Sequence, residues 1–214
     1  MNSPQASSPT SPLPESAPDT AALLDATLRF ADAHYALQDW LAARDFLTLA
    51  VQMAPDQAQV QAALGSLNYQ LQDYPAAIAS FATAVRLNAS DPDVQTQLAM
   101  ALLQNKEVGA AEAALLRALE LRPNFPTAIK LLADSKLGRR CYPEAAALYG
   151  KLIRQHPNQV GVFLCLAKCF FGVGDSEGAE SALGQVLTID PNNEIARDNL
   201  LVLQGKAPSL VPSA

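Results

Sequence analysis

A 34-residue period runs through the chain and constrains its fold more than any other feature of the sequence. It is clearest at one alanine, which returns without slippage at Ala43, Ala77, Ala111, Ala145 and Ala179. The same step joins four prolines, with Ala89 in the vacant place: Pro55, Pro123, Pro157 and Pro191. A large apolar residue keeps this register at Phe30, Leu64, Leu98, Leu132, Leu166 and Leu200. So many positions sharing one period indicate a repeat protein, in which each unit buries its apolar face on its neighbour.

Each repeat predicts two helices. With position 1 set at Leu24, Ala58, Pro92, Pro126 and Val160, the repeats are 24–57, 58–91, 92–125, 126–159 and 160–193. Helix A is predicted over positions 2–14 and helix B over positions 17–28, because apolar residues recur there at the spacing of amphipathic helices. Before helix B, Asp39, Asp73 and Asp175 predict N-caps, and Glu107 and Cys141 predict weaker ones.

The two ends of the chain differ from the repeats. Residues 1–19 hold five serines, five prolines and almost no large apolar side chain, so we expect a disordered leader. The repeat domain is predicted over 20–204, with its last helix at 194–204 as a cap, and a flexible tail over 205–214. No basic n-region followed by an apolar core opens the chain, so a secretory signal is not predicted. No apolar run approaches about 18 residues, so a membrane span is not predicted either.

Charge and cysteine content limit the function classes. The net charge of −6 argues against a nucleic-acid partner, which normally requires a basic face. Three cysteines do not suggest a disulfide framework. Cys165 and Cys169 lie four apart on a predicted helix, where their Cβ atoms would be about 5–6 Å apart, too far for a disulfide. A reducing, cytoplasmic location is therefore expected.

The repeat resembles the tetratricopeptide repeat (TPR) family, bacterial type. That family has a large then a small residue in helix A, an early alanine and a later aromatic or leucine in helix B, and a closing proline. Two repeats match it best, through Leu64-Gly65, Ala77, Phe81 and Ala84, and through Leu132-Ala133, Ala145, Tyr149 and Pro157. The family's helix A tryptophan is replaced by Thr27, Gln61, Gln95, Ile129 and Phe163. The resemblance covers about 24–204. It implies an all-α fold, a right-handed α-solenoid of five helix–turn–helix repeats of 34 residues with a C-terminal capping helix.

Candidate catalytic and metal-binding residues are few. His34 is predicted to be at least half-buried and His156 to be solvated, and neither is placed beside a nucleophile by the repeat. Cys165 and Cys169 have no two further ligands at structural-zinc spacing. The glycine-rich segment from Gly172 to Gly178 superficially resembles a phosphate-binding loop. It falls in the predicted turn between helices A and B of the fifth repeat, which is a sufficient explanation for it. We therefore expect no enzyme activity, no metal and no cofactor.

The predicted binding surface lies on helix A, where positions 2, 5, 9 and 12 share one arc. In proteins that this chain resembles, that arc lines a concave groove for partner peptides. Position 12 is apolar in every repeat: Tyr35, Tyr69, Leu103, Leu137 and Phe171. The other candidate groove residues are Asp32, Met100, Lys130, Asp134 and Lys168. The alternative is that the neighbouring repeat covers position 12, which then only packs. A clamp for the carboxylate of a chaperone tail is not expected, because only Lys130 fits it and Asp32 and Asp134 would repel a carboxylate.

The predicted function is a non-enzymatic scaffold or adaptor that binds a peptide segment or helix in this groove. One alternative is the regulatory or substrate-presenting region of a larger enzyme such as a glycosyltransferase. Another is a bacterial secretion chaperone.

Overall fold

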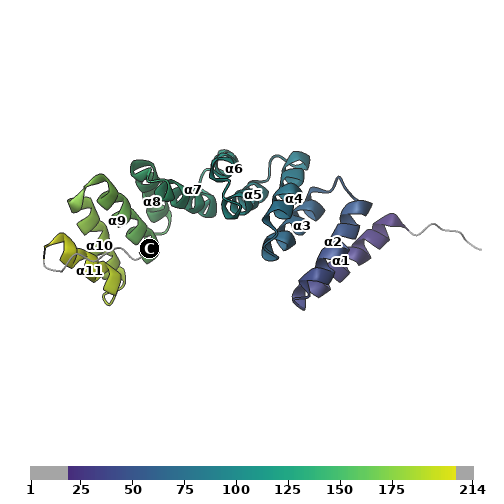
Figure 1. Ribbon diagram of the computed structural model, residues 1–214, viewed down its shortest axis with the longest axis horizontal. Coiled ribbons are helices and arrows are strands. Elements are labelled where there is room, and N and C mark those ends of the chain that lie inside the picture. Colours follow the sequence, from purple (N-terminus) through teal and green to yellow (C-terminus); the bar gives the residue numbers. More distant parts are fainter. Residues whose placement is uncertain (1–18, 206–214) are drawn as a thin grey trace, which may run out of the picture. The chain divides into compact units, whose positions relative to one another are not determined.

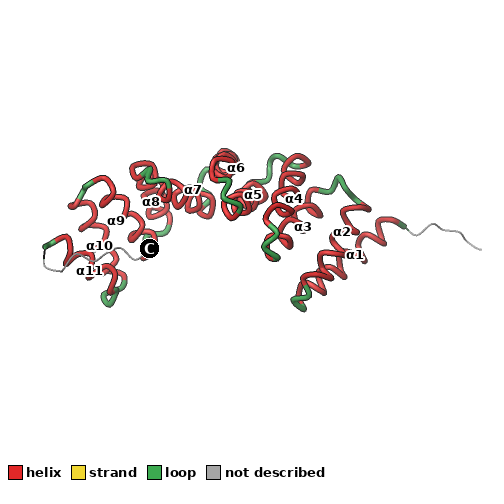
Figure 2. Tube along the Cα trace, in the orientation of Figure 1, coloured by secondary structure: helices red, strands yellow, loops and turns green. Residues whose placement is uncertain are grey.

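The structure is a computed structural model that describes residues 19–205. Within that range all regular structure is helical, and Figure 2 shows helices joined by short turns. The helices follow one another as α1 (Thr20–Ala36), α2 (Trp40–Met53), α3 (Ala58–Gln70), α4 (Tyr74–Leu87), α5 (Pro92–Gln104), α6 (Val108–Leu121), α7 (Pro126–Gly138), α8 (Tyr142–Gln155), α9 (Val160–Val173), α10 (Ser176–Ile189) and α11 (Glu194–Leu203) (Figure 1). The chain divides into two compact units, one ending at Asp56 and the other beginning at Gln57.

The helices form pairs with the predicted period. In the first unit α1 packs on α2, and in the second unit the pairs are α3–α4, α5–α6, α7–α8 and α9–α10. Each pair of the second unit also packs on the next one, through α4–α5, α6–α7 and α8–α9, and α11 packs on α10. The prediction of an all-α repeat solenoid is confirmed. The predicted disorder of the leader and of the tail falls on 1–18 and 206–214, which lie outside the described residues, so it stays a prediction, as do the domain limits.

The period is so regular because it follows the buried contact between the two helices of a pair. The five alanines at position 20 have 0% exposure: Ala43, Ala77, Ala111, Ala145 and Ala179. The small residue at position 8 of helix A is also buried in every repeat, so two small residues let the paired helices approach closely. The large residue at position 24 fills the remaining space, with exposure of 6% or less: Leu47, Phe81, Leu115, Tyr149 and Leu183.

Phe30 differs from its counterparts at position 7. Its ring stacks on Phe46 of α2 at 5.5 Å between centroids. Phe30 nevertheless stays 56% exposed, whereas Leu132 at the same position is 3% exposed. Phe30 is therefore only partly covered by its partner helix.

The turn between helices A and B has the same backbone in all five repeats. One residue in each adopts a positive φ between 60° and 78°: Gln38, Gln72, Lys106, Arg140 and Gly174. The next N–H then donates back to a carbonyl of helix A, as Asp73 does to Asn68 at 2.9 Å, which satisfies the helix end. This conformation costs a non-glycine residue about 1–2 kcal/mol. Four repeats therefore carry strain that glycine relieves in the fifth.

The predicted N-caps of helix B are present. The Asp39, Asp73 and Asp175 carboxylates accept from the backbone N–H groups of Ala42, Ala76 and Gly178 at 3.3, 3.2 and 2.8 Å. Glu107 and Cys141 make no side-chain capping bond. The weaker caps predicted for α6 and α8 are thus confirmed.

Candidate functional site

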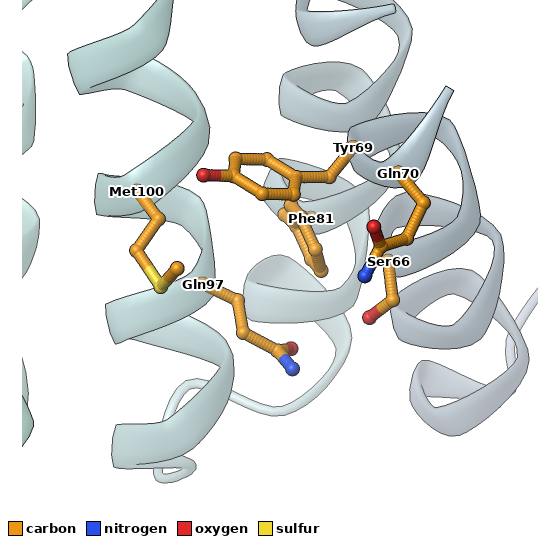
Figure 3. A pocket seen from close by; sticks show the side chains of 6 residues that line it. All are labelled: Ser66, Tyr69, Gln70, Phe81, Gln97 and Met100. Atoms are coloured by element: carbon orange, nitrogen blue, oxygen red, sulfur yellow. The ribbon is translucent and has the colours of Figure 1, made fainter. Parts of the chain in front are cut away.

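A first pocket lies between α3, α4 and α5 of the second unit (Figure 3). We call it the Tyr69 pocket. Its volume is about 190 Å³, and its lining is Ser66, Tyr69, Gln70, Phe81, Gln97 and Met100. Figure 3 shows Tyr69 and Met100 extending toward each other from opposite helices, with the ring of Phe81 behind Tyr69. Two rings and a thioether form an apolar floor, and the amides of Gln70 and Gln97 supply polar groups at its side. Such a pocket can accept one apolar side chain.

The Tyr69 side chain is held in place by its own repeat. Its ring makes an edge-to-face contact with Tyr74 at 5.6 Å between centroids, and Tyr69 is half-buried. Phe81 below it is only 1% exposed. The pocket is therefore built from side chains that core packing already orients.

A second pocket lies between α7, α8 and α9, and we call it the Asp134 pocket. Its volume is about 470 Å³, and its lining is Asp134, Leu137, Gly138, Arg140, Tyr142 and Lys168. Asp134, Leu137 and Lys168 hold the same repeat positions as Ser66, Tyr69 and Met100 in the first pocket. The same combination therefore lines both pockets of the second unit. It consists of positions 9 and 12 of one helix A and position 9 of the next helix A.

Asp134 is tied both to the surface and to the core. One carboxylate oxygen, Oδ2, binds the Lys130 ammonium at 2.7 Å. The other, Oδ1, accepts from the hydroxyl of Tyr149 at 2.6 Å, and Tyr149 has 0% exposure. Burial, together with this bond to Asp134, raises the pKa of Tyr149, so its hydroxyl stays protonated as a donor. Arg140 and Lys168 make no ion pair with any described residue. The Asp134 pocket therefore combines a compensated carboxylate with two unpaired cations.

The remaining predicted groove residues have different surroundings. Leu103 is half-buried on α5, and Phe171 on α9 is 39% exposed. Tyr35 and Asp32 belong to the first unit, where Tyr35 is 43% exposed and packs edge-on against Trp40 at 4.8 Å. Of the ten predicted residues, the two pockets bring together Tyr69 with Met100, and Asp134 with Leu137 and Lys168.

Comparison with known families decides what kind of repeat this is. The sequence model of the tetratricopeptide repeat family matches residues 62–126 and 130–194, more than half of the chain. The chain belongs to the tetratricopeptide repeat family. A search of the curated proteins gives no match.

Solved tetratricopeptide structures share the fold. A crystal structure of MamA is 18% identical over 90% of this chain and 100% of its own, with a TM-score of 0.77. YrrB, described as a TPR protein with an unusual peptide-binding site, is 18% identical over 85% of this chain and 97% of its own, with a TM-score of 0.73. A tetratricopeptide repeat protein from Parabacteroides merdae ATCC 43184 is 16% identical over 86% of this chain and 74% of its own, with a TM-score of 0.75. At these identities the likeness concerns the fold.

One polar cluster of this tetratricopeptide array was missed by sequence reasoning. Glu112 of α6 is 7% exposed and accepts from Ser135 and Arg139, both at 2.9 Å, while Lys136 lies 3.1 Å away. Lys136 also pairs with Glu144 of α8 at 3.0 Å. Burial acts to raise the pKa of Glu112, but the bonds from Lys136, Ser135 and Arg139 outweigh it and lower that pKa overall. One feature of the sequence could have indicated this cluster. Lys136 is a charged residue at a repeat position that holds Leu102 and Phe170 in the neighbouring repeats.

The histidines and cysteines, the residue types most often used in catalysis and metal binding, are packed or solvated as ordinary side chains here. His34 is half-buried, stacks on Phe46 at 5.3 Å and lies 3.1 Å from Asp39, and His156 is exposed, both as predicted. Cys165 and Cys169 are free thiols, and burial raises the pKa of Cys169 to about 11. Over residues 19–205, no three His, Cys, Asp or Glu side chains group as metal ligands. None of the helices in that range is long and apolar enough to cross a membrane.

Proposed function

We propose that this tetratricopeptide protein is a non-enzymatic interaction scaffold that binds a peptide segment or helix of a partner protein. The binding surface is the helix A face that carries positions 9 and 12. The observation that carries the proposal is the recurrence of one hollow, built from the same repeat positions, at the Tyr69 pocket and at the Asp134 pocket. A row of equivalent pockets suits a chain-like ligand that presents side chains at intervals.

The two pockets favour different parts of such a ligand. Tyr69, Phe81 and Met100 provide an apolar site for an anchoring side chain. Arg140 and Lys168 are free to approach polar or acidic groups at the second site. Because Tyr69 is already held by Tyr74, little side-chain freedom is lost on binding, which lowers the cost of association.

Composition and the similar structures support the rest of the proposal. The net charge of −6 favours a protein partner over nucleic acid, and three free cysteines fit a reducing cytoplasm. YrrB, which has this fold, is described as having a peptide-binding site, and this supports the same use of the fold here. The proposed partner is therefore a protein, bound without enzyme chemistry and without a cofactor.

The test is affinity capture followed by a binding measurement with the purified partner. The 214-residue chain is compared with a Tyr69→Ala/Met100→Ala variant, and with Leu116→Ala as a matched control. Leu116 is 52% exposed on α6 and lines neither pocket, so its truncation removes apolar surface elsewhere. A partner that the folded double variant loses and the control retains supports the proposal. Equal binding by all three proteins contradicts it.

A further inference from the structure

The first helix exposes an apolar stripe on its outer side. Residues 23, 26, 30, 33 and 37 of α1 and its cap follow the 3–4 spacing of a coiled-coil seam and lie on one face. We call these residues the outer stripe: Leu23, Ala26, Phe30, Ala33 and Leu37. Its three large members are 48%, 56% and 77% exposed, in chain order. Leu41, which follows directly in α2, is 58% exposed.

The same face of helix A is an interface elsewhere in the protein. In the third, fourth and fifth repeats, the equivalents of Ala26 have exposures of 9%, 0% and 3%: Val94, Ala128 and Val162. The equivalents of Ala33 include Ala101 and Cys169, both 0% exposed. Each of these A helices packs on the helix B that precedes it in the chain, namely α4, α6 or α8. In α1, by contrast, Ala26 is half-buried and Ala33 is exposed. The outer stripe thus has the pattern of a packed face.

The last helix exposes apolar residues as well, but in a different arrangement. α11 packs on α10 through Ala196, which has 0% exposure, and it exposes the charged Arg197 and Asp198 together with Ile195 and Leu201, at 60% and 37%. Asp198 separates Ile195 from Leu201 on that helix. In α1 the apolar residues instead follow an unbroken 3–4 spacing from Leu23 to Leu37.

The order of residues identifies a second copy of the chain as the occupant. The outer stripe has large and small members in the symmetric order Leu, Ala, Phe, Ala, Leu, with Phe30 at its centre and a leucine seven residues to each side. A two-fold interface requires a patch that is complementary to itself. Two antiparallel α1 helices centred on Phe30 would set Leu23 of each copy beside Leu37 of the other. Residues 1–18 contain two large apolar side chains, Met1 and Leu13.

The exposed area also suits a dimer. Burying the exposed parts of Leu23, Phe30, Leu37 and Leu41 removes about 240–480 Å² of apolar surface per copy, since a large side chain contributes roughly 100–200 Å². Two copies thus contribute about 480–960 Å², a range that includes the apolar share of an interface of about 1,200–1,600 Å². We propose that the outer stripe of α1 joins two copies of this chain in a two-fold, antiparallel dimer.

Complementary charges provide the test. Sedimentation velocity of the 214-residue chain, from low to high micromolar concentration, is expected to show a dimer. Leu23→Glu and Leu37→Lys should each weaken that dimer by at least about tenfold. An equimolar mixture of the two variants should recover a dimer, because the glutamate introduced in one chain meets the lysine introduced in the other, and the two unchanged leucines meet each other. Ile195→Glu on α11, where Ile195 is 60% exposed, is the matched control and should leave dimerisation unchanged.

Three results would overturn the proposal. One is a wild-type chain that stays monomeric at every concentration. Another is a dimer that neither single variant weakens, since the interface would then lie elsewhere. The third is a mixture that stays monomeric although both variants have the wild-type helical circular dichroism spectrum, because the antiparallel pairing would then be wrong.

Discussion

The ring of Phe81 lies directly against Gly65, so that a Cβ on Gly65 would come within 2.8 Å of two ring carbons. The other four repeats place alanine at this position of helix A: Ala31, Ala99, Ala133 and Ala167. The fourth repeat combines Ala133 with the ring of Tyr149, so the close contact at Gly65 belongs to the way α3 packs on α4. The pair of Gly65 and Phe81 fixes how closely α3 approaches α4.

Gly65→Ala should destabilise the protein although alanine favours helices. The gain in helix propensity is about 1 kcal/mol, and overpacking against the buried ring costs about 1–3 kcal/mol. We expect urea denaturation to show a free energy of unfolding lower by about 1 kcal/mol. Adding Phe81→Leu should remove the penalty, because Ala99 and Ala167 occur in repeats that have Leu115 and Leu183. A Gly65→Ala protein at least as stable as wild type would show that the contact relaxes freely.

Tyr149→Phe should cost about 1.5–3 kcal/mol of unfolding free energy, because it removes a hydrogen bond to a charged acceptor. The lost bond is the one that the fully buried Tyr149 donates from its hydroxyl to the half-buried carboxylate of Asp134. Tyr142→Phe is the matched control, since the half-buried Tyr142 hydroxyl forms no hydrogen bond to another described side chain. Equal losses in the two variants would mean that the Tyr149 hydroxyl contributes nothing specific.

Glu112→Gln should lower the free energy of unfolding near neutral pH by about 1–3 kcal/mol, because it weakens the hydrogen bond from Ser135 and the ion pairs with Lys136 and Arg139. The effect should depend on pH. The folded state lowers the pKa of Glu112 below the ordinary value of 4.5. Above 4.5 the carboxylate is ionised in both states and its full contribution is present. As pH falls further the unfolded state takes up the proton first, so this contribution declines.

Denaturation of wild type and Glu112→Gln at several pH values checks this sign. The stability difference between the two proteins should be constant at neutral pH and should narrow below about pH 4.5. The comparison cancels the titration of the other carboxylates. A difference that widens on acidification would contradict the lowered pKa.

The left-handed turn residue allows a reciprocal pair of substitutions. Gln72→Gly should raise the free energy of unfolding by about 0.5–1 kcal/mol, because φ of 61° strains glutamine and not glycine. Gly174→Gln should lower it by a similar amount. No heavy atom lies within 4 Å of a Cβ built on Gly174, so the loss would come from the backbone alone. Thermal denaturation measures both effects. Melting temperatures that shift in the same direction for the two variants would contradict the proposed strain at this turn position.

Sequence periodicity predicts the features that recur from repeat to repeat. The alanines at position 20, the aspartate N-caps of α2, α4 and α10, and the helix starts at Pro92 and Pro126 all follow from it. Each depends on local geometry or on the contact between the two helices of a pair. The repeat period therefore reveals the alanine in five repeats, the aspartate cap in three and the proline helix start in two.

Features confined to one repeat could not be predicted in the same way. The bonds of Glu112 with Ser135 and Arg139 join residues more than twenty apart, on two helices. Their meeting depends on how the third and fourth repeats pack. The left-handed residue was missed because Gln72, Lys106 and Arg140 share no chemical type. For the candidate site, position analysis predicted Tyr69, Met100, Asp134, Leu137 and Lys168, but not Phe81 or Tyr142, which reach the pockets from helix B.

The bonds that connect Lys130, Asp134 and Tyr149 make the surface and the interior of the fourth repeat thermodynamically interdependent. A ligand carboxylate that draws Lys130 away would leave Asp134 with the buried tyrosine as its remaining donor. The energy of that rearrangement would be subtracted from the ligand's affinity. By reciprocity, the same ligand would lower the local stability of the helix pair that it binds, α7 and α8. Occupancy at this end of the array could therefore be followed from inside the protein, as a change in the protection of α8 amide hydrogens.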